Sequence, residues 1–358
     1  MQIPFLSLTP GADALDVRAA IDRVVTRGWF VLGPELEAFE QEFASASGAA
    51  HAVGVGTGTD AIALALMALG VGPGDEVITS PLSAAYSALA IMMAGARPVF
   101  ADIDPDRLTM SPLEVERAIT PKTKALLPVH LYGQPADMTA LAAIAARHRL
   151  LIVEDCCQAH LASAEGRAVG TWGAAGAFSF YPTKNLGALG DAGAIVTGDA
   201  SLADRLRRLR NGGQTSRYHH GEFGVNSRLD EMQAAILRAR LPRLGDWTAR
   251  RRQIAARYRA GLATAPVRVP REHDAGHVYH LFPILTPDRD ALQARLREAG
   301  VETLIHYPLP ITAQPALHAS APAACPIATR VAGEVLSLPL HPGLSDEAVD
   351  VICRLIRG

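Results

Sequence analysis

The sequence predicts an α/β protein with a mainly parallel central sheet flanked by helices and a smaller α+β unit at its C-terminal end. Between residues 51 and 200, short apolar runs alternate with segments of helical periodicity, which is the pattern of strand–helix–strand units. Beyond residue 200 the chain becomes Arg-rich and helical, and a strand and further helices follow. We therefore expect a large domain at 1–240, with an N-terminal helical segment, and a smaller domain at 241–358.

The strands expected in the large domain are short runs of mostly apolar residues bounded by turn residues or charges. In chain order they are His51–Val55, Glu76–Ser80, Arg97–Ala101, Ala125–His130, Leu150–Val153, Ala177–Phe180 and Ala194–Thr197. The helices expected between them are Thr59–Leu69, Ala84–Ala94 and Met138–His148. Sheets of this kind bind ligands beyond the carboxyl ends of their strands, so functional residues are expected there.

Two Arg-rich helical segments follow the last of these strands. They are Leu202–Arg210 and Asp230–Ala260, and Pro242 is expected to kink the second one. The rest of the chain is expected in this order: a link at Thr264–His277, a strand at Val278–Leu285, a helix at Asp288–Ala299, a Pro-rich loop at Tyr307–Pro326 and two later helices.

Composition argues against several classes of protein. Lys plus Arg number 34 and Asp plus Glu 36, so the formal charge of −2 argues against a nucleic-acid-binding protein, which usually carries a basic excess. The uncharged stretch Val77–Ala96 is long enough to cross a membrane, but it contains polar residues and a proline, so no membrane span is expected. The four cysteines lack metal-ligand spacing, which indicates reduced thiols in a cytoplasmic protein and no metal site.

Two motifs that follow predicted strands suggest ligand binding. The first, Gly54–Asp60 (GVGTGTD), leads into a helix, whose first amides could hold a phosphate, although an ordinary Gly-rich turn has the same pattern. The second centres on Asp155 (VEDCC), just past a buried strand, where a carboxylate is costly unless it is paired. Asp155 could pair with a protonated ring nitrogen or cap a helix.

A third motif surrounds Lys184 in the string FSFYPTKNLG. Only three of the 34 basic residues are lysines, and this one lies in an apolar, Gly-rich neighbourhood. Burial there would lower its pKa and give the nucleophilic amine that Schiff-base chemistry needs; a surface lysine in a loop is the alternative. A phosphate-holding turn, an Asp and a Lys in this order together meet the requirements of pyridoxal 5′-phosphate.

These segments resemble a known family. The strings GTGTDA, VEDCCQAH, FSFYPTKNLGALGDAGAIVT and GVNSRLDEMQAAIL are similar to those of the DegT/DnrJ/EryC1/StrS sugar aminotransferases, which are fold-type I pyridoxal-phosphate enzymes. The similarity extends over nearly the whole chain. It implies transfer of an amino group from an amino acid, with L-glutamate as the implied donor, to a nucleotide-linked keto sugar.

The resemblance also implies roles for individual residues. It makes Lys184 the Schiff-base lysine and Asp155 the partner of the pyridine nitrogen. The further cofactor contacts that it implies are Gly58, Thr59 and Ser179 at the phosphate, Gln158 beside the phenolic oxygen, and Asn226 reaching the phosphate from the neighbouring subunit. The contact of Asn226 implies a homodimer with shared active sites. Alternatively, Asn226 is only a turn residue or a helix cap.

Implied substrate contacts fall into two groups. Arg217, His219 and His220 resemble a loop that lies near the sugar nucleotide, often from the partner subunit, and their side chains suit a diphosphate. The second group lies in segments that line the pocket in relatives, with structural packing as the alternative role: Tyr181, His306 and Tyr307.

The sequence departs from the family pattern at two places. The usual Thr–aromatic pair after a proline turn is replaced by PLSAAY, where Tyr86 is the best candidate to stack on the cofactor ring. Thr312 stands where many relatives that aminate the third sugar carbon have His, whereas Gln158 favours 3-keto sugars or keto-cyclitols. The expected acceptor is a 3-keto-6-deoxyhexose, used for polysaccharide or antibiotic biosynthesis.

Several alternatives stay open at this stage. A keto-cyclitol or a 4-keto sugar would serve the same chemistry as the expected acceptor. A few relatives dehydrate sugars instead, but they replace the lysine with His, so Lys184 argues against that reaction. An alternative of another class is a non-catalytic, cofactor-binding regulatory protein, against which Lys184, Asp155 and Ser179 argue.

Overall fold

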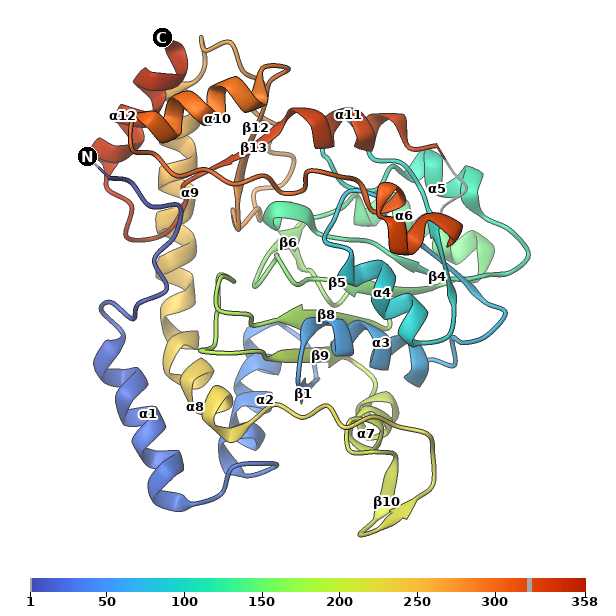
Figure 1. Cartoon of the computed structure of the whole chain (residues 1–358). Helices are drawn as coiled ribbons and strands as arrows, with labels where there is room; N and C mark the ends of the chain where they lie inside the picture. Colours follow the sequence, from blue (N-terminus) through green and yellow to red (C-terminus); the bar gives the residue numbers. More distant parts are fainter. Residues whose placement is uncertain (1, 321–323) are drawn as a thin grey trace.

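A seven-stranded sheet forms the centre of the molecule, in the order β1-β9-β8-β5-β4-β2-β3 (Figure 1). The computed structural model describes residues 2–320 and 324–358. Only β9 runs antiparallel to its two neighbours, β8 and β1. The strands are β1 (His51–Val55), β2 (Glu76–Thr79), β3 (Arg97–Phe100), β4 (Thr123–Leu127), β5 (Leu151–Asp155), β8 (Ala175–Ser179) and β9 (Gly193–Thr197), so the seven strands predicted in this region are confirmed.

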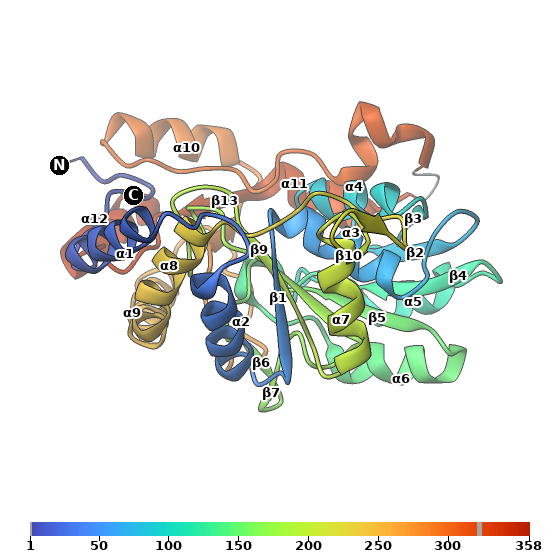
Figure 2. The same cartoon turned by 90° about the horizontal axis from the view of Figure 1, so that it is seen from below.

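Helices cover both faces of this sheet (Figure 2). Successive strand residues point to opposite faces, so Val53 packs in one hydrophobic cluster and Ala52 in another. The first cluster includes residues of α3 (Gly58–Ala68), α4 (Tyr86–Met93) and α7 (Ala200–Leu209). The opposite face packs against α2 (Pro34–Ala46), α5 (Pro112–Ala118) and α6 (Met138–His148).

A buried glutamate fixes the start of α2. Gly33, Glu35 and Leu36 donate their backbone N–H groups to the carboxylate of Glu231, at 2.8–3.0 Å. A helix start leaves such donors without intrahelical partners, and Glu231 satisfies three of them from α8 (Glu231–Arg240). Glu231, the glutamate of the string LDEMQ, therefore has a structural role, because it joins two segments far apart in the sequence.

The chain leaves the large domain through a broken helix. Between α8 and α9 (Leu244–Gly261) lies a 3₁₀ turn at Leu241–Arg243, which contains Pro242 and confirms the predicted break. The helix α1 (Ala14–Arg27) packs against α8 in a small hydrophobic cluster. Together with α2 it forms the predicted N-terminal helical segment.

The C-terminal unit has its own hydrophobic cluster, which includes Tyr258, Phe282, Leu338 and Ile352. Ile3 belongs to the same cluster and bridges to Val301, so the first residues of the chain pack with its last third. A domain boundary near residue 240 stays a prediction. The elements of this region are β12 (Phe282–Leu285), α10 (Arg289–Glu298), α11 (Pro326–Glu334), β13 (Val335–Leu338) and α12 (Asp346–Arg357).

The structure corrects the sequence analysis in a few places. The strand expected at Val278–Leu285 begins only at Phe282, because residues 278–281 turn toward the large domain. Short 3₁₀ turns occupy part of the expected loop Tyr307–Pro326, at Ile311–Ala313 and Pro315–Ser320, and its residues 321–323 lie outside the described ranges. Four two- or three-residue strands were too short for a periodicity to reveal: β6 (Ser163–Ala164), β7 (Arg167–Ala168), β10 (Gln214–Ser216) and β11 (His219–His220).

The uncharged stretch Val77–Ala96 divides into most of β2, a turn, α4 and the residues that follow it. Among the described helices, none combines the length and the apolar character needed to cross a membrane.

Candidate active site

Lys184 lies in a tight loop between β8 and β9. Its backbone N–H donates to the carbonyl of Tyr181 at 2.8 Å, and Ala188 closes the loop by donating to Phe180 at 2.7 Å. Burial lowers the pKa of Lys184 below the ordinary lysine value, and the neighbouring Cys157 and Asp155 side chains partly oppose that effect. The amine is therefore more easily deprotonated than a surface lysine, which is what a nucleophilic amine requires.

Asp155 is the last residue of β5 and is buried. Oδ2 accepts a 2.7 Å hydrogen bond from the hydroxyl of Ser87 on α4, and Oδ1 accepts a 3.1 Å bond from the backbone N–H of Cys157. The next helix after β5 is α7, which begins only at Ala200, so Asp155 does not cap a helix. Its carboxylate is instead held at the carboxyl end of the sheet.

The start of α3 lies against Ser179, the last residue of β8. A side chain at Gly58 would put its Cβ only 2.6 Å from Cβ of Ser179 and 2.9 Å from Sγ of Cys157, so only glycine fits there. Thr57 caps the helix, because its hydroxyl accepts from the N–H of Asp60 at 3.0 Å. A helix start beside a hydroxyl is an anion-binding arrangement.

Ser227 ties this turn to the segment before α8. Its hydroxyl accepts from the N–H of Gly56 at 2.9 Å and donates to Oδ2 of Asp60 at 2.7 Å. Asn226, the neighbouring residue, is exposed. The backbone around Asn226 is thus fixed close to the Gly-rich turn of its own chain, while its side chain stays accessible.

Gln158 connects two further segments of the site. Oε1 accepts from the N–H of Tyr132 at 2.7 Å, and Nε2 donates to the hydroxyl of Tyr307 at 3.1 Å. Tyr132 in turn donates to the carbonyl of His306. Burial raises the pKa of Tyr307 to about 12 and lowers that of His306 to about 4, so both side chains are uncharged at neutral pH. Tyr86, at the start of α4, is exposed.

Three predicted substrate residues lie apart from this group. Arg217, His219 and His220 are exposed on or beside the β10–β11 hairpin, which extends away from the sheet beyond α7 (Figure 1). Tyr181 is in the Lys184 loop and half-exposed. The single chain therefore brings Lys184, Asp155, Gly58, Thr59, Ser179, Gln158, His306 and Tyr307 into one region and leaves the hairpin residues outside it.

Sequence reasoning missed the residues that hold these groups in place. Ser87, Ser227, Tyr132 and Asn185 are ordinary residues in the sequence, and each bonds to a partner distant along the chain. Of these four residues, only Ser227 and Asn185 lie inside strings that resemble the family. That resemblance is the one sequence signal that could have pointed to them.

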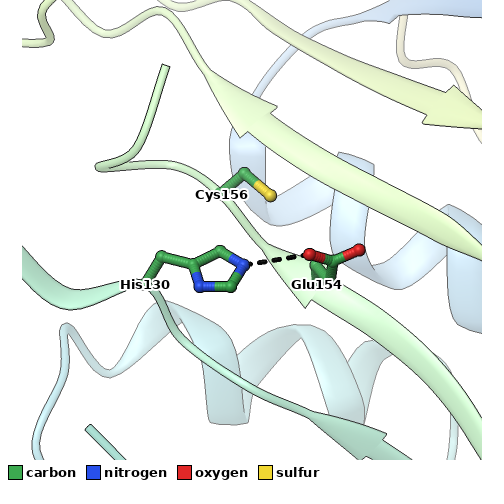
Figure 3. Close-up of side chains that lie close together, drawn as sticks. All are labelled: His130, Glu154 and Cys156. Carbon is green, nitrogen blue, oxygen red and sulfur yellow. Dashed lines mark hydrogen bonds and ion pairs between the residues drawn. The ribbon is translucent and has the colours of Figure 1, made fainter. Parts of the chain in front are cut away.

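A buried cluster of His130, Glu154 and Cys156 has the residue types of a metal site (Figure 3). Nδ1 of His130 accepts from the N–H of Ala136 at 3.0 Å, so Nε2 carries the proton and donates to Glu154 at 3.1 Å. Glu154 also accepts three backbone N–H groups, from Gly170, Trp172 and Gly173. Burial keeps Cys156 a thiol by raising its pKa, so these hydrogen bonds describe a structural cluster.

Two hollows flank the Lys184 loop, with volumes of about 580 and 710 Å³. Both are lined by Thr183 and by Arg251 of α9. Lys184 lines the larger one, and His280 and His306 line the smaller one. Lys184 is therefore reached from the side of the C-terminal unit.

The residues fit pyridoxal phosphate. Lys184 offers an amine for an aldehyde, Asp155 a fixed carboxylate for a protonated ring nitrogen, and the start of α3 with Ser179 a phosphate site. Their position at the carboxyl ends of parallel strands agrees with the rule for such sheets. Fold and site together define a fold-type I pyridoxal-phosphate-dependent transferase.

Comparisons with known proteins name the family. The family model of the DegT/DnrJ/EryC1/StrS aminotransferases matches residues 13–357, and the chain belongs to this family. A dTDP-3-amino-3,4,6-trideoxy-alpha-D-glucose transaminase of Streptomyces venezuelae is 51% identical, over 96% of this chain and 92% of that protein. The erythromycin biosynthesis sensory transduction protein EryC1 of Saccharopolyspora erythraea is 49% identical, over 100% of both chains.

Solved structures give the same result. The structure of S. venezuelae DesV in complex with a ketimine intermediate matches with a TM-score of 0.97 and 49% identity, over 99% of this chain and 98% of that one. A structure of NtdA from Bacillus subtilis with bound cofactor PMP matches with a TM-score of 0.92 and 32% identity, over 100% of this chain and 86% of that one. The chain is a pyridoxal-phosphate-dependent aminotransferase.

Proposed function

We propose that this enzyme transfers the amino group of L-glutamate to carbon 3 of a dTDP-linked 3-keto-6-deoxyhexose. The observation that carries the aminotransferase chemistry is the arrangement of Lys184, Asp155 and the Gly58–Ser179 contact at one end of the sheet. The nucleotide and the carbon follow from the 51% identical relative, whose name gives a dTDP-linked 3-amino sugar. The product would serve antibiotic or polysaccharide assembly.

The chain's own residues have defined tasks in this reaction. The Lys184 amine, with its lowered pKa, would take the proton from the α-carbon of the amino acid and deliver it to the carbon that was the cofactor's aldehyde carbon. Asp155 stabilises a positive charge on the ring nitrogen, and Ser179 and the first amides of α3 bind the phosphate. Pyridoxal phosphate supplies the electron sink for the carbanion formed at the α-carbon.

The test is a pair of separate half-reactions. Purified protein loaded with pyridoxal phosphate should lose its yellow absorption band when L-glutamate is added and regain it when a dTDP-linked 3-keto-6-deoxyhexose follows. The acceptor panel should include a 4-keto sugar nucleotide and a keto-cyclitol. Faster return of the band with either of these would contradict the proposed acceptor, and a band unchanged by L-glutamate would contradict the proposed donor.

We also propose a homodimer in which each subunit completes the site of the other. The β10–β11 region carries Tyr218 and Phe223, which are 77% and 83% exposed, so two aromatic side chains are available here for a subunit contact. Arg217, His219 and His220 lie beside them, and Asn226 is exposed near the Gly-rich turn proposed to bind phosphate.

We also propose that Tyr86, at the start of α4, stacks on the cofactor ring.

Subunit mixing tests the shared site. The Lys184→Ala and Asn226→Ala proteins should each be impaired alone. Mixed dimers should regain activity, because one of their two sites combines Lys184 of one chain with Asn226 of the other. Mixtures that form dimers but stay as inactive as the separate variants would show that the two residues serve the same chain's site.

A cytoplasmic location completes the proposal. Cys156, Cys157 and Cys353 carry free thiols, which is the normal state of cysteine in a reducing compartment. Fractionation of the producing cells, followed by the half-reaction described above, would test it.

A further inference from the structure

The segment 278–281 joins the C-terminal unit to two loops of the active site. The N–H of Val278 donates to the carbonyl of Gly133 at 3.0 Å, and Leu281 donates to Tyr132 at 3.3 Å. Gly133 has a φ of +92°, and a Cβ there would lie 2.9 Å from the backbone N of His280, so the two backbones touch. His280 is therefore held at a fixed position beside the catalytic loops.

Asn185, which follows Lys184, orients the His280 ring. Its Nδ2 donates to the carbonyl of Val278 at 3.0 Å, which leaves its Oδ1 to face Nδ1 of His280 at 3.3 Å. An amide oxygen only accepts hydrogen bonds, so Nδ1 of the ring carries the proton. The other ring nitrogen, Nε2, is then a hydrogen-bond acceptor.

His280 is uncharged and faces a hollow. Burial, followed by the positive charges of Lys184 and Arg251 and the rings of His306 and His160, holds its pKa well below the ordinary histidine value. His280 lines the 580 Å³ hollow together with Thr183, Arg251 and His306. Among the described residues its Nε2 has no hydrogen-bond partner, whereas Nδ1 faces Asn185.

The charges around this hollow select the kind of ligand group that Nε2 can accept from. An ammonium group is disfavoured by the cations of Lys184 and Arg251, and a carboxylate, although these cations attract it, has no hydrogen to donate to Nε2. A neutral hydroxyl fits, because it donates to Nε2 and can accept from the guanidinium of Arg251, which also lines the hollow.

We propose that His280 is a substrate-binding residue whose Nε2 accepts a hydrogen bond from a sugar hydroxyl, and that Asn185 is the positioning residue that fixes its tautomer. This inference rests on the proposed function and specifies which part of the substrate enters the hollow: the neutral sugar ring and not the amino acid. Arg251 is the neighbouring donor. The two halves of the reaction should therefore respond differently to changes at His280.

Two substitutions separate the two ring nitrogens. His280→Asn keeps an amide nitrogen where Nδ1 donates to Asn185 and removes the group that faces the hollow. His280→Gln reaches further and can place an amide oxygen near the position of Nε2. His148→Asn, on the exposed surface of α6, is the matched control.

The affinity of the holoenzyme for dTDP-6-deoxyglucose, which has no keto group to react, is measured by calorimetry. His280→Asn should weaken this binding roughly 3- to 10-fold, the effect of one neutral hydrogen bond, and His280→Gln should restore part of it. The L-glutamate half-reaction should stay within about 2-fold of wild type. Histidine ¹⁵N spectra should show His280 neutral, with its proton on Nδ1.

Three results would overturn the inference. These are wild-type affinity in His280→Asn, an equal loss in both half-reactions, and a proton on Nε2 in the spectra. A wild-type enzyme that converts L-glutamate but aminates no keto sugar would instead remove the proposed function, and with it the basis of the inference.

Discussion

Ser87 on α4 donates a 2.7 Å hydrogen bond to Oδ2 of Asp155 at the end of β5. The N–H of Cys157 binds the other carboxylate oxygen, Oδ1. Two donors on two oxygens fix the plane of a buried carboxylate, whose orientation decides how well it pairs with a ring nitrogen. The helix α4 therefore takes part in the site through Ser87, whose hydroxyl has hydrogen bonds only with Asp155 and Ser83 among the described residues.

Asp155→Asn should reduce kcat roughly 10²- to 10³-fold, because the neutral amide no longer stabilises the charge on the ring nitrogen. Ser87→Ala should cost only about 3- to 10-fold, since it removes one hydrogen bond that orients the carboxylate. Steady-state rates with saturating L-glutamate measure both effects. A Ser87→Ala loss as large as that of Asp155→Asn would mean that Ser87 has a role of its own in the chemistry.

Lys184→Ala should remove the yellow band and lower turnover by roughly 10²- to 10⁴-fold, because the amine both binds the aldehyde and moves the proton. The chain offers a strict control, since its only other lysines are Lys122 and Lys124, both exposed. The double variant Lys122→Ala/Lys124→Ala should keep the band and the rate. A yellow Lys184→Ala protein with normal transamination would disprove the assignment.

Cofactor uptake should depend on pH in a defined direction. Below its pKa, Lys184 is protonated and cannot attack an aldehyde, so the rate at which apoprotein takes up pyridoxal phosphate should rise with pH. Because burial lowers this pKa, the rise should level off below the ordinary lysine value of 10.5. Stopped-flow absorbance between pH 6 and pH 10 measures it. An uptake rate that is still rising at pH 10, as expected for an unburied lysine, would contradict this prediction.

Glu231→Ala should lower the free energy of unfolding by about 3 kcal/mol, because it leaves three N–H groups at the start of α2 without partners. Urea titration followed by circular dichroism measures the change. Glu347→Ala, an exposed glutamate in the first turn of α12, is the control and should have little effect. Equal losses in the two variants would show that the capping contacts carry no special stability.

The sequence predicts the parts of this protein whose signals are local. Periodicity identifies the central strands, and a Lys or Asp beside a strand end stands out because such groups are costly to bury. Ser87 and His280 give no local signal, since their importance comes from partners 68 and 95 residues away. Glu231 resembles any helix-start acid until α2 is seen to dock on it. Contacts between distant segments thus account for what the sequence analysis missed.

The antiparallel strand β9 also constrains the order in which this protein can fold during translation. The edge strand β1, which leads directly into the Gly-rich turn proposed to bind phosphate, pairs only with β9, and Val55 faces Gly193 across that pairing. A ribosome makes β1 early and β9 only after every other strand of the sheet has emerged. Until then the Gly-rich turn lacks the neighbour that supports it, so we expect cofactor loading to follow the translation of the last strand of the sheet.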